Sequence, residues 1–147
     1  MKTIALSTGA PKRIGFVSTR FHGTDGVTLE ARKWARILAA MGHSCFWMAG
    51  LLDTPSETSH LAPLAFFGHR DVLAAQENIF GATTRSREIT RRIQSLKEQL
   101  KEELYRFVEK FQIELLIPQN ILAIPMHVPL GLAMTEVIAE TGLPTIA

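Results

Sequence analysis

The most constraining feature of this sequence is an apolar run that passes through two glycines into a helical pattern. Residues 12–18 carry strand-forming side chains, Gly23 and Gly26 follow, and apolar residues then recur with helical spacing over 27–41. A buried strand that turns through glycine into a helix is typical of the first unit of an α/β domain. We therefore expect the turn between them to face a ligand.

Strand-like and helix-like segments alternate along the rest of the chain. The expected strands are 12–18, 43–49, 64–67, 113–117 and 143–147. The expected helices are 27–41, 71–80, 84–111 and 129–141. Such alternation implies right-handed crossovers between parallel strands, with helices on both faces. The sequence predicts an α/β fold, a Rossmann-like three-layer sandwich with a mostly parallel sheet of about five strands in the order 3-2-1-4-5.

The length of one helix and the position of the last strand lead to further expectations. Helix 84–111 would extend about 40 Å, roughly twice the length of a typical strand, so part of it should project past the sheet or bend. Segment 143–147 reads as a buried strand with no loop or helix after it. We therefore expect the chain to be one half of a larger unit.

Size and composition fit one globular domain. The 147 residues are 46% hydrophobic, and 16 basic against 14 acidic residues give a formal charge of +2, which argues against nucleic acid as a partner. No stretch approaches the roughly 18 apolar residues of a spanning helix. The single cysteine, Cys45, excludes a disulfide framework and favours a reducing compartment. We expect a short leader over 1–11, a domain over 12–147, and a cytoplasmic location, with contact to the inner face of a membrane as an option.

The carboxyl ends of the expected strands are where ligands bind in open α/β sheets. At the first such end, glycines let the backbone approach a ligand, and a helix N-terminus offers free N–H groups to a phosphate or sugar oxygen. At the end of strand 113–117, amide side chains can exchange hydrogen bonds with hydroxyls. The candidate binding residues are His22, Gly23, Thr24, Asp25, Gly26, Gln119 and Asn120.

Each candidate also has an ordinary structural explanation. The glycines can simply shape the turn, and Asp25 can cap the helix that follows. Asn120 can serve as a turn former, and His22 as a solvated loop residue. The sequence leaves these alternatives open.

Several common site types lack their sequence patterns. Gly23 and Gly26 are not joined by a third glycine in register, which excludes the dinucleotide fingerprint, and the absence of Gly-Lys-Ser/Thr excludes a P-loop. The five histidines show no metal-ligand spacing. We expect no metal and no resident cofactor, and the sequence identifies no catalytic residue.

Arginines crowd the start of the long predicted helix, where positive charge opposes the helix dipole. They are Arg85, Arg87, Arg91 and Arg92. A solvated face partly neutralised by Glu88 is the simplest interpretation, and anionic lipid or a phosphorylated substrate is the alternative.

Four short motifs follow one another along the chain: Gly23-Thr-Asp-Gly-Val27, Glu30-Ala-Arg-Lys-Trp-Ala35, Met41-Gly-His43 and the segment 123–136. In order and spacing they resemble the amino-terminal domain of GT-B fold, family 4 glycosyltransferases. The resemblance covers nearly the whole chain after residue 11. It implies a retaining enzyme of two domains, with the acceptor bound by this half and the nucleotide-sugar donor mainly by a carboxyl-terminal half.

By this resemblance, catalysis occurs between the two halves. The backbone over 23–26 would approach the acceptor or the donor diphosphate, and Gln119 and Asn120 would face the transferred sugar. The donor-half signature, two glutamates with seven residues between them, does not occur here. The resemblance therefore implies a hexosyltransferase that needs its own carboxyl-terminal domain as partner, with this chain inactive alone.

Two departures from the family pattern shift the expected ligand. Asp25-Gly26 stands where many relatives have two glycines, and Gln119 and Asn120 stand where many have a histidine. Because an acid would repel phosphate, the turn is expected to bind acceptor hydroxyls.

Two rival functions remain at this point. A stand-alone flavodoxin-like domain could use the same glycine turn for a small anionic ligand. An interaction module could dock a partner on the long charged helix, although its apolar stripe is better explained by packing on the sheet.

Overall fold

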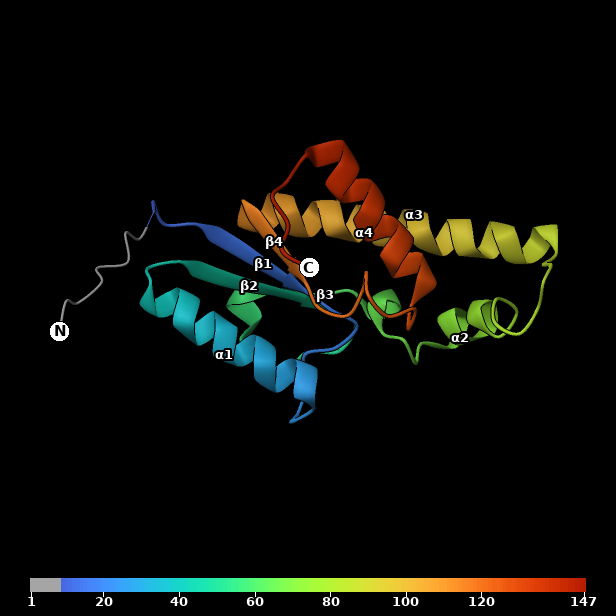
Figure 1. Cartoon of the computed structure of the whole chain (residues 1–147), viewed down its shortest axis with the longest axis horizontal. Coiled ribbons are helices and arrows are strands. Elements are labelled where there is room, and N and C mark those ends of the chain that lie inside the picture. Colours follow the sequence, from blue (N-terminus) through green and yellow to red (C-terminus); the bar gives the residue numbers. More distant parts are fainter. Residues whose placement is uncertain (1–8) are drawn as a thin grey trace.

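Four parallel strands form the sheet of the computed structural model, which describes residues 9–147 (Figure 1). They are β1 (Arg13–Val17), β2 (Ser44–Ala49), β3 (Ser59–Leu61) and β4 (Leu115–Pro118). The order is β3-β2-β1-β4, and every neighbouring pair is parallel. The α/β class and the parallel sheet are therefore confirmed, and this arrangement is consistent with a Rossmann-like fold. Most of the leader expected over 1–11 lies outside the described residues.

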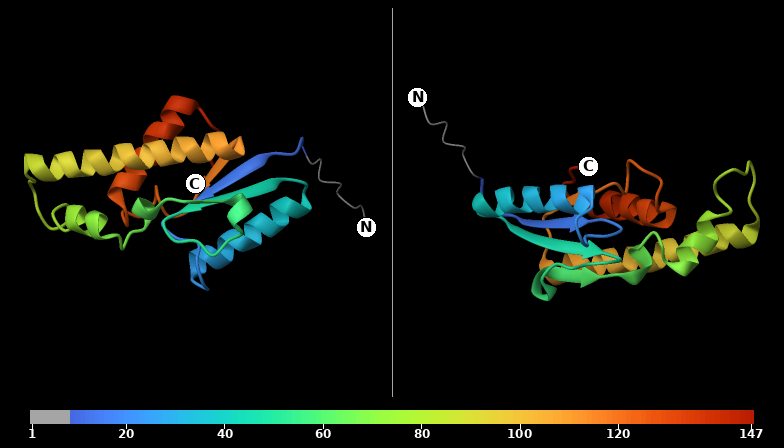
Figure 2. Two further views of the ribbon diagram at one scale, coloured as in Figure 1. Left: turned by 180° about the vertical axis from the view of Figure 1, so that it is seen from behind. Right: turned by 90° about the horizontal axis from the view of Figure 1, so that it is seen from below.

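Helices cover both faces of this sheet (Figures 1 and 2). Side chains alternate along a strand, so Ile14 and Phe16 of β1 pack beneath α1 (Gly26–Ala40), whereas Val17 points to the opposite face. On that opposite face, α3 (Arg87–Phe111) and α4 (Val128–Thr141) pack against each other and against the sheet. The result is two apolar cores, one on each side of a buried β1.

The expected third strand was misplaced. Segment 64–67 is not a strand of the sheet: Pro63 opens a 3-10 turn over Pro63–Ala65, and the rings of Phe66 and Phe67 then contact each other with centroids 4.8 Å apart. The strand is instead Ser59–Leu61, inside the segment expected to be a loop, where it pairs with Trp47 to Ala49 of β2. This polar segment has no strand pattern of its own, and it becomes a strand because it pairs with the free edge of β2.

The expected fifth strand was also wrong. Segment 143–147 does lie beside β4, but it contributes only one isolated bridge, between Thr145 and Leu116. Leu116 donates to the Pro144 carbonyl oxygen at 2.9 Å and accepts from the Ile146 N–H at 2.9 Å. Pro144 has no N–H to extend the ladder. The sheet of the described residues therefore has four strands rather than five.

The long helix α3 projects past the carboxyl edge of the sheet without a break (Figure 1). It begins three residues later than expected, because the Ser86 hydroxyl caps it by accepting from the Ile89 N–H at 3.2 Å. Its projecting part is covered by α2 (Arg70–Gln76), which is shorter than the expected 71–80. Val72 and Ala75 of α2 pack there against Ile93 and Leu96.

The remaining elements match their expected positions closely. α1, β1, β2 and α4 start and end within one or two residues of the predicted bounds, and β4 begins two residues after the predicted start and ends one residue later. In the part of the chain that the structure describes, no helix combines the length and the apolar character needed to cross a bilayer.

Candidate functional site

The two predicted ligand-facing corners lie next to each other. Because β1 and β4 are parallel neighbours, their carboxyl ends reach the same edge of the sheet. The N–H of Gln119 donates to the Val17 carbonyl oxygen at 2.8 Å, and the Ser18 hydroxyl donates to the Gln119 carbonyl oxygen at 3.1 Å. The turn after β1 and the corner after β4 therefore form one rim.

A small cavity of about 90 Å³ opens at this rim. It is lined by Ser18, Thr19, Arg20, Asp25, Val27, Phe67, Asn120 and Met126. The lining mixes hydroxyl, amide, carboxylate and guanidinium groups with one aromatic ring. Such a mixture suits a neutral ligand that has many hydroxyl groups and one apolar face.

Asp25 occupies the N-terminus of α1, as its structural explanation predicted. Its carboxylate accepts from the Thr28 N–H at 3.2 Å and from the Thr28 hydroxyl at 2.7 Å, and its carbonyl oxygen accepts from the Leu29 N–H at 3.0 Å. Partial burial acts to raise the pKa of Asp25, but the hydrogen bonds of Thr28 and the charge of Arg20, 3.5 Å away, outweigh it and lower that pKa. The Thr28 N–H is therefore not free for a ligand, and the Leu29 bond is the first regular hydrogen bond of the helix.

The glycine turn is fixed by an ion pair that the sequence analysis missed. Gly23, with a φ of +74°, donates its N–H to Asp53 Oδ2 at 2.8 Å. Arg32 forms an ion pair with Asp53 and donates to the Gly23 carbonyl oxygen at 3.2 Å. The hydrogen bond from Gly23 is the main cause that lowers the pKa of Asp53. Both backbone polar groups of Gly23 are thus bonded, and its N–H is not free to bind a ligand.

The other candidate residues have different positions relative to the cavity. The side chains of His22 and Thr24 are exposed and do not line it, whereas Asn120 does. Asn120 has a φ of +59°, so it is also a turn former. Gln119 lies at the corner, half-buried, with its backbone rather than its amide side chain bonded to the end of β1.

The loop that follows Asn120 is held in place by two buried or half-buried side chains. His127 caps α4: its Nδ1 accepts from the Leu130 N–H at 3.1 Å, and its Nε2 lies 2.7 Å from the Leu64 carbonyl oxygen. Gln76 of α2 donates to the Met126 carbonyl oxygen at 2.9 Å and accepts from the Val128 N–H at 2.7 Å. Burial lowers the pKa of His127, which fits the neutral tautomer that this geometry requires.

The predicted arginine cluster lies at the projecting end of α3 and lines no part of the rim cavity. Arg92 pairs with Glu88 at 2.8 Å, and Arg85 donates to the Thr90 hydroxyl at 3.0 Å. Arg87 and Arg91 are exposed. The cation that does reach the cavity is Arg20, which the sequence analysis did not select. Its position in the turn between segment 12–18 and Gly23 is the signal that could have found it.

Among residues 9–147, no three histidine, cysteine, aspartate or glutamate side chains come together as metal ligands. A larger open groove, of about 680 Å³, lies away from the rim between α1 and β2.

Comparison with protein-family models, with curated proteins and with solved structures finds no match to this chain.

Proposed function

We propose that this chain is the acceptor-binding half of a retaining glycosyltransferase that uses a nucleotide-sugar donor. The observation that carries the proposal is the shared rim. The glycine turn and the Gln119-Asn120 corner come from distant parts of the sequence, and both border one polar cavity. Of the residues that the family resemblance selects, Asp25 and Asn120 line this cavity.

The chemistry of the rim favours a neutral hydroxylated ligand over a phosphate. At the N-terminus of α1 the Thr28 and Leu29 N–H groups are bonded to Asp25, and the Gly23 N–H is bonded to Asp53. Both partners are carboxylates whose pKa is lowered, so both are negative at neutral pH. An anion here would meet two carboxylates, and the nearest cations, Arg20 and Arg32, are already paired with them. This argues against the rival flavodoxin-like domain that binds a small anion at the turn.

A sugar acceptor meets complementary groups at the same place. The Asn120 amide and the Thr19 hydroxyl can exchange hydrogen bonds with sugar hydroxyls, and the ring of Phe67 offers an apolar surface to the C–H face of a sugar. The cavity is small, so it fits part of one sugar ring rather than a whole disaccharide.

Transfer itself requires groups that this proposal places in a second domain. In such a reaction, negative charge develops on the leaving diphosphate, and cations or helix N-termini aimed at it supply much of the rate enhancement. The α1 N-terminus is already neutralised by Asp25, so this chain contributes acceptor binding and orientation. We therefore propose that it is inactive without a donor-binding partner domain.

Two binding measurements on the chain test this function. Saturation-transfer NMR against a panel of methyl glycosides should detect binding of at least one of them. Asn120→Gly should abolish that signal, whereas Asn78→Gly in the exposed turn after α2 should not. Calorimetry with UDP-glucose and GDP-mannose should show negligible binding. Micromolar affinity for a nucleotide-sugar, or no binding of any glycoside at millimolar concentration, would overturn the proposal.

A further inference from the structure

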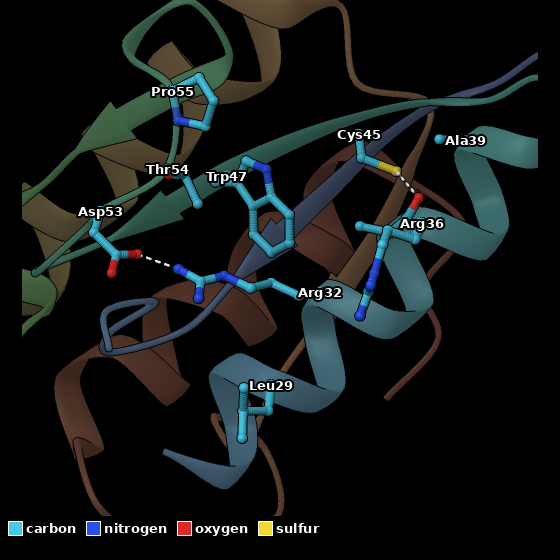
Figure 3. Close-up of a pocket in the computed structure, with 10 residues that line it drawn as sticks. Leu29, Arg32, Arg36, Ala39, Cys45, Trp47, Asp53, Thr54 and Pro55 are labelled. Atoms are coloured by element: carbon cyan, nitrogen blue, oxygen red, sulfur yellow. Dashed lines mark hydrogen bonds and ion pairs between the residues drawn. The ribbon is translucent and has the colours of Figure 1, made fainter. Parts of the chain in front are cut away.

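An unusually short connection leaves part of the sheet open beside α1. Parallel strands are normally joined by a crossover of a dozen or more residues, usually a helix that covers the sheet. Here β2 and β3 are joined by residues 50–58, which contain only a 3-10 turn over Ser56–Thr58. In the described part of the chain, the face of β2 next to α1 therefore has no second helix over it, and an open groove of about 680 Å³ remains there (Figure 3).

The indole of Trp47 forms the floor of this groove. It is 7% exposed, and one of its faces is stacked on Phe16 with ring centroids 4.9 Å apart and an interplanar angle of 21°. Phe21 meets it edge-on at 5.0 Å. Trp47 lines the groove, so the small exposed part of its ring can contact a planar group that enters there.

The Trp47 indole N–H is a donor without a protein acceptor among the described residues. No hydrogen bond from it to residues 9–147 is formed, whereas the exposed Trp34 N–H does donate, to Glu30 at 3.2 Å. No buried side-chain nitrogen or oxygen of the described residues lacks a partner, so the Trp47 N–H reaches solvent. A rigid, nearly buried donor of this kind is typical of the polar groups that orient a ligand.

The α1 wall of the groove carries positive charge. Arg32 is balanced by its ion pair with Asp53 on the opposite wall. Arg36 also lines the groove, and it makes no ion pair or hydrogen bond with any residue that the structure describes. Beside these arginines the wall consists of the small side chains Ala35 and Ala39, which keep the groove wide. The local charge therefore favours an anion near Arg36.

We propose that this groove binds a small aromatic monoanion, with its ring system against Trp47 and its carboxylate or sulfonate at Arg36. The volume lies within the range of small-molecule sites, which are mostly apolar and carry a few placed polar groups. A neutral aromatic compound would satisfy the apolar floor and leave Arg36 unused. A dianionic phosphate would bring a second charge close to Asp53. This site is separate from the rim cavity and does not depend on the proposed function.

NMR of the ¹⁵N-labelled chain detects binding in the groove directly, because one indole N–H signal comes from Trp47 in the groove and the other from Trp34 outside it. Titration with 1-naphthoate should shift the Trp47 signal in a saturable way and leave the Trp34 signal in place. The neutral analogue 1-naphthalenemethanol should bind about fivefold more weakly, which is the effect of losing one exposed ion pair. A Trp34→Phe variant assigns the two signals.

Matched variants on α1 separate the groove from the rest of the helix. Arg36→Gln should weaken naphthoate binding about fivefold, and Ala39→Trp should abolish it by filling the groove. The exposed residues Lys33 and Ala40 do not line it, so Lys33→Gln and Ala40→Trp should bind as the wild type does. The proposal would be overturned if the Trp47 signal did not move, or if the groove variants and the control variants had equal effects. It would also be overturned if the Trp47 shift depended on protein concentration alone. The last result would mean that a second copy of the chain fills the groove.

Discussion

The Ser18 hydroxyl donates a hydrogen bond of 3.1 Å to the carbonyl oxygen of Gln119, across 101 positions of the sequence. Ser18 is 3% exposed and directly follows β1, whereas Gln119 directly follows β4. This bond joins the two strand ends where the ligand-facing segments begin. The glycine turn and the amide corner are therefore positioned as one unit, which is the basis of the proposed acceptor site.

Asn120 offers a way to separate turn formation from ligand binding. Its φ of +59° suits asparagine and glycine but strains alanine. We expect Asn120→Ala to lower the free energy of unfolding by about 1 kcal/mol and Asn120→Gly to leave it within about 0.5 kcal/mol of wild type. Urea unfolding measures both. Both variants should lose glycoside binding, and a glycine variant that binds normally would show that Asn120 only forms the turn.

Asp25 should contribute to stability through its cap of α1. Its carboxylate accepts two hydrogen bonds from Thr28, so Asp25→Ala should lower the free energy of unfolding by about 1 kcal/mol, while Asp25→Ser keeps most of the cap. The exposed neighbour Thr24 makes no such bond, and Thr24→Ala is the control. If the alanine variant at position 25 unfolded at the same urea concentration as wild type, the capping role would be disproved.

The two glycines of the turn should differ in their structural importance. Gly23 has a φ of +74°, so Gly23→Ala should cost about 1 kcal/mol. Gly26 has no positive φ, and a Cβ built there meets nothing within 4 Å, so Gly26→Ala should be neutral for stability. Thermal unfolding of the two variants tests this difference. Loss of glycoside binding in the stable Gly26 variant would indicate close approach of the ligand to that backbone, and equal destabilisation of both variants would contradict the account.

His127 should make the chain less stable in mild acid. Burial lowers its pKa, and in the fold its Nδ1 must stay unprotonated to accept from Leu130. As the pH falls, the unfolded chain therefore takes up this proton before the folded chain does. The contribution is complete above the ordinary imidazole pKa and is lost as the pH falls toward the folded value, by at most about 1.4 kcal/mol per pH unit.

Urea unfolding between about pH 7.5 and pH 5.5 measures this dependence. His127→Asn should flatten it, because asparagine can cap α4 without titrating in this range. His22 is exposed, and His22→Gln should retain the wild-type slope. The same slope in all three proteins would assign the dependence to other groups.

Much of the fold could be predicted because local patterns and tertiary packing agree. The apolar β1 and β2 and the amphipathic stripe of α3 each carry the period of the structure that they form. Their parallel pairing then follows from the alternation of strands and helices. The shared rim is a direct consequence of that topology.

The parts that the sequence did not predict depend on partners that are distant in the chain. β3 is a polar segment that becomes a strand because β2 offers it a free edge, and segment 143–147 forms one bridge only. The tie between Asp53, Arg32 and Gly23 joins three separate segments, and no spacing rule links them. The same holds for Phe67 and Met126, which reach the cavity from loops of irregular conformation.

Amide shifts of the ¹⁵N-labelled chain during titration with a methyl glycoside test most directly whether the two strand ends form one acceptor site. The account predicts that the backbone signals over 19–26 and those of Gln119 and Asn120 move together, with one common dissociation constant. If the signals of only one of these segments moved, or if neither segment responded to any glycoside in the panel, the account would be contradicted.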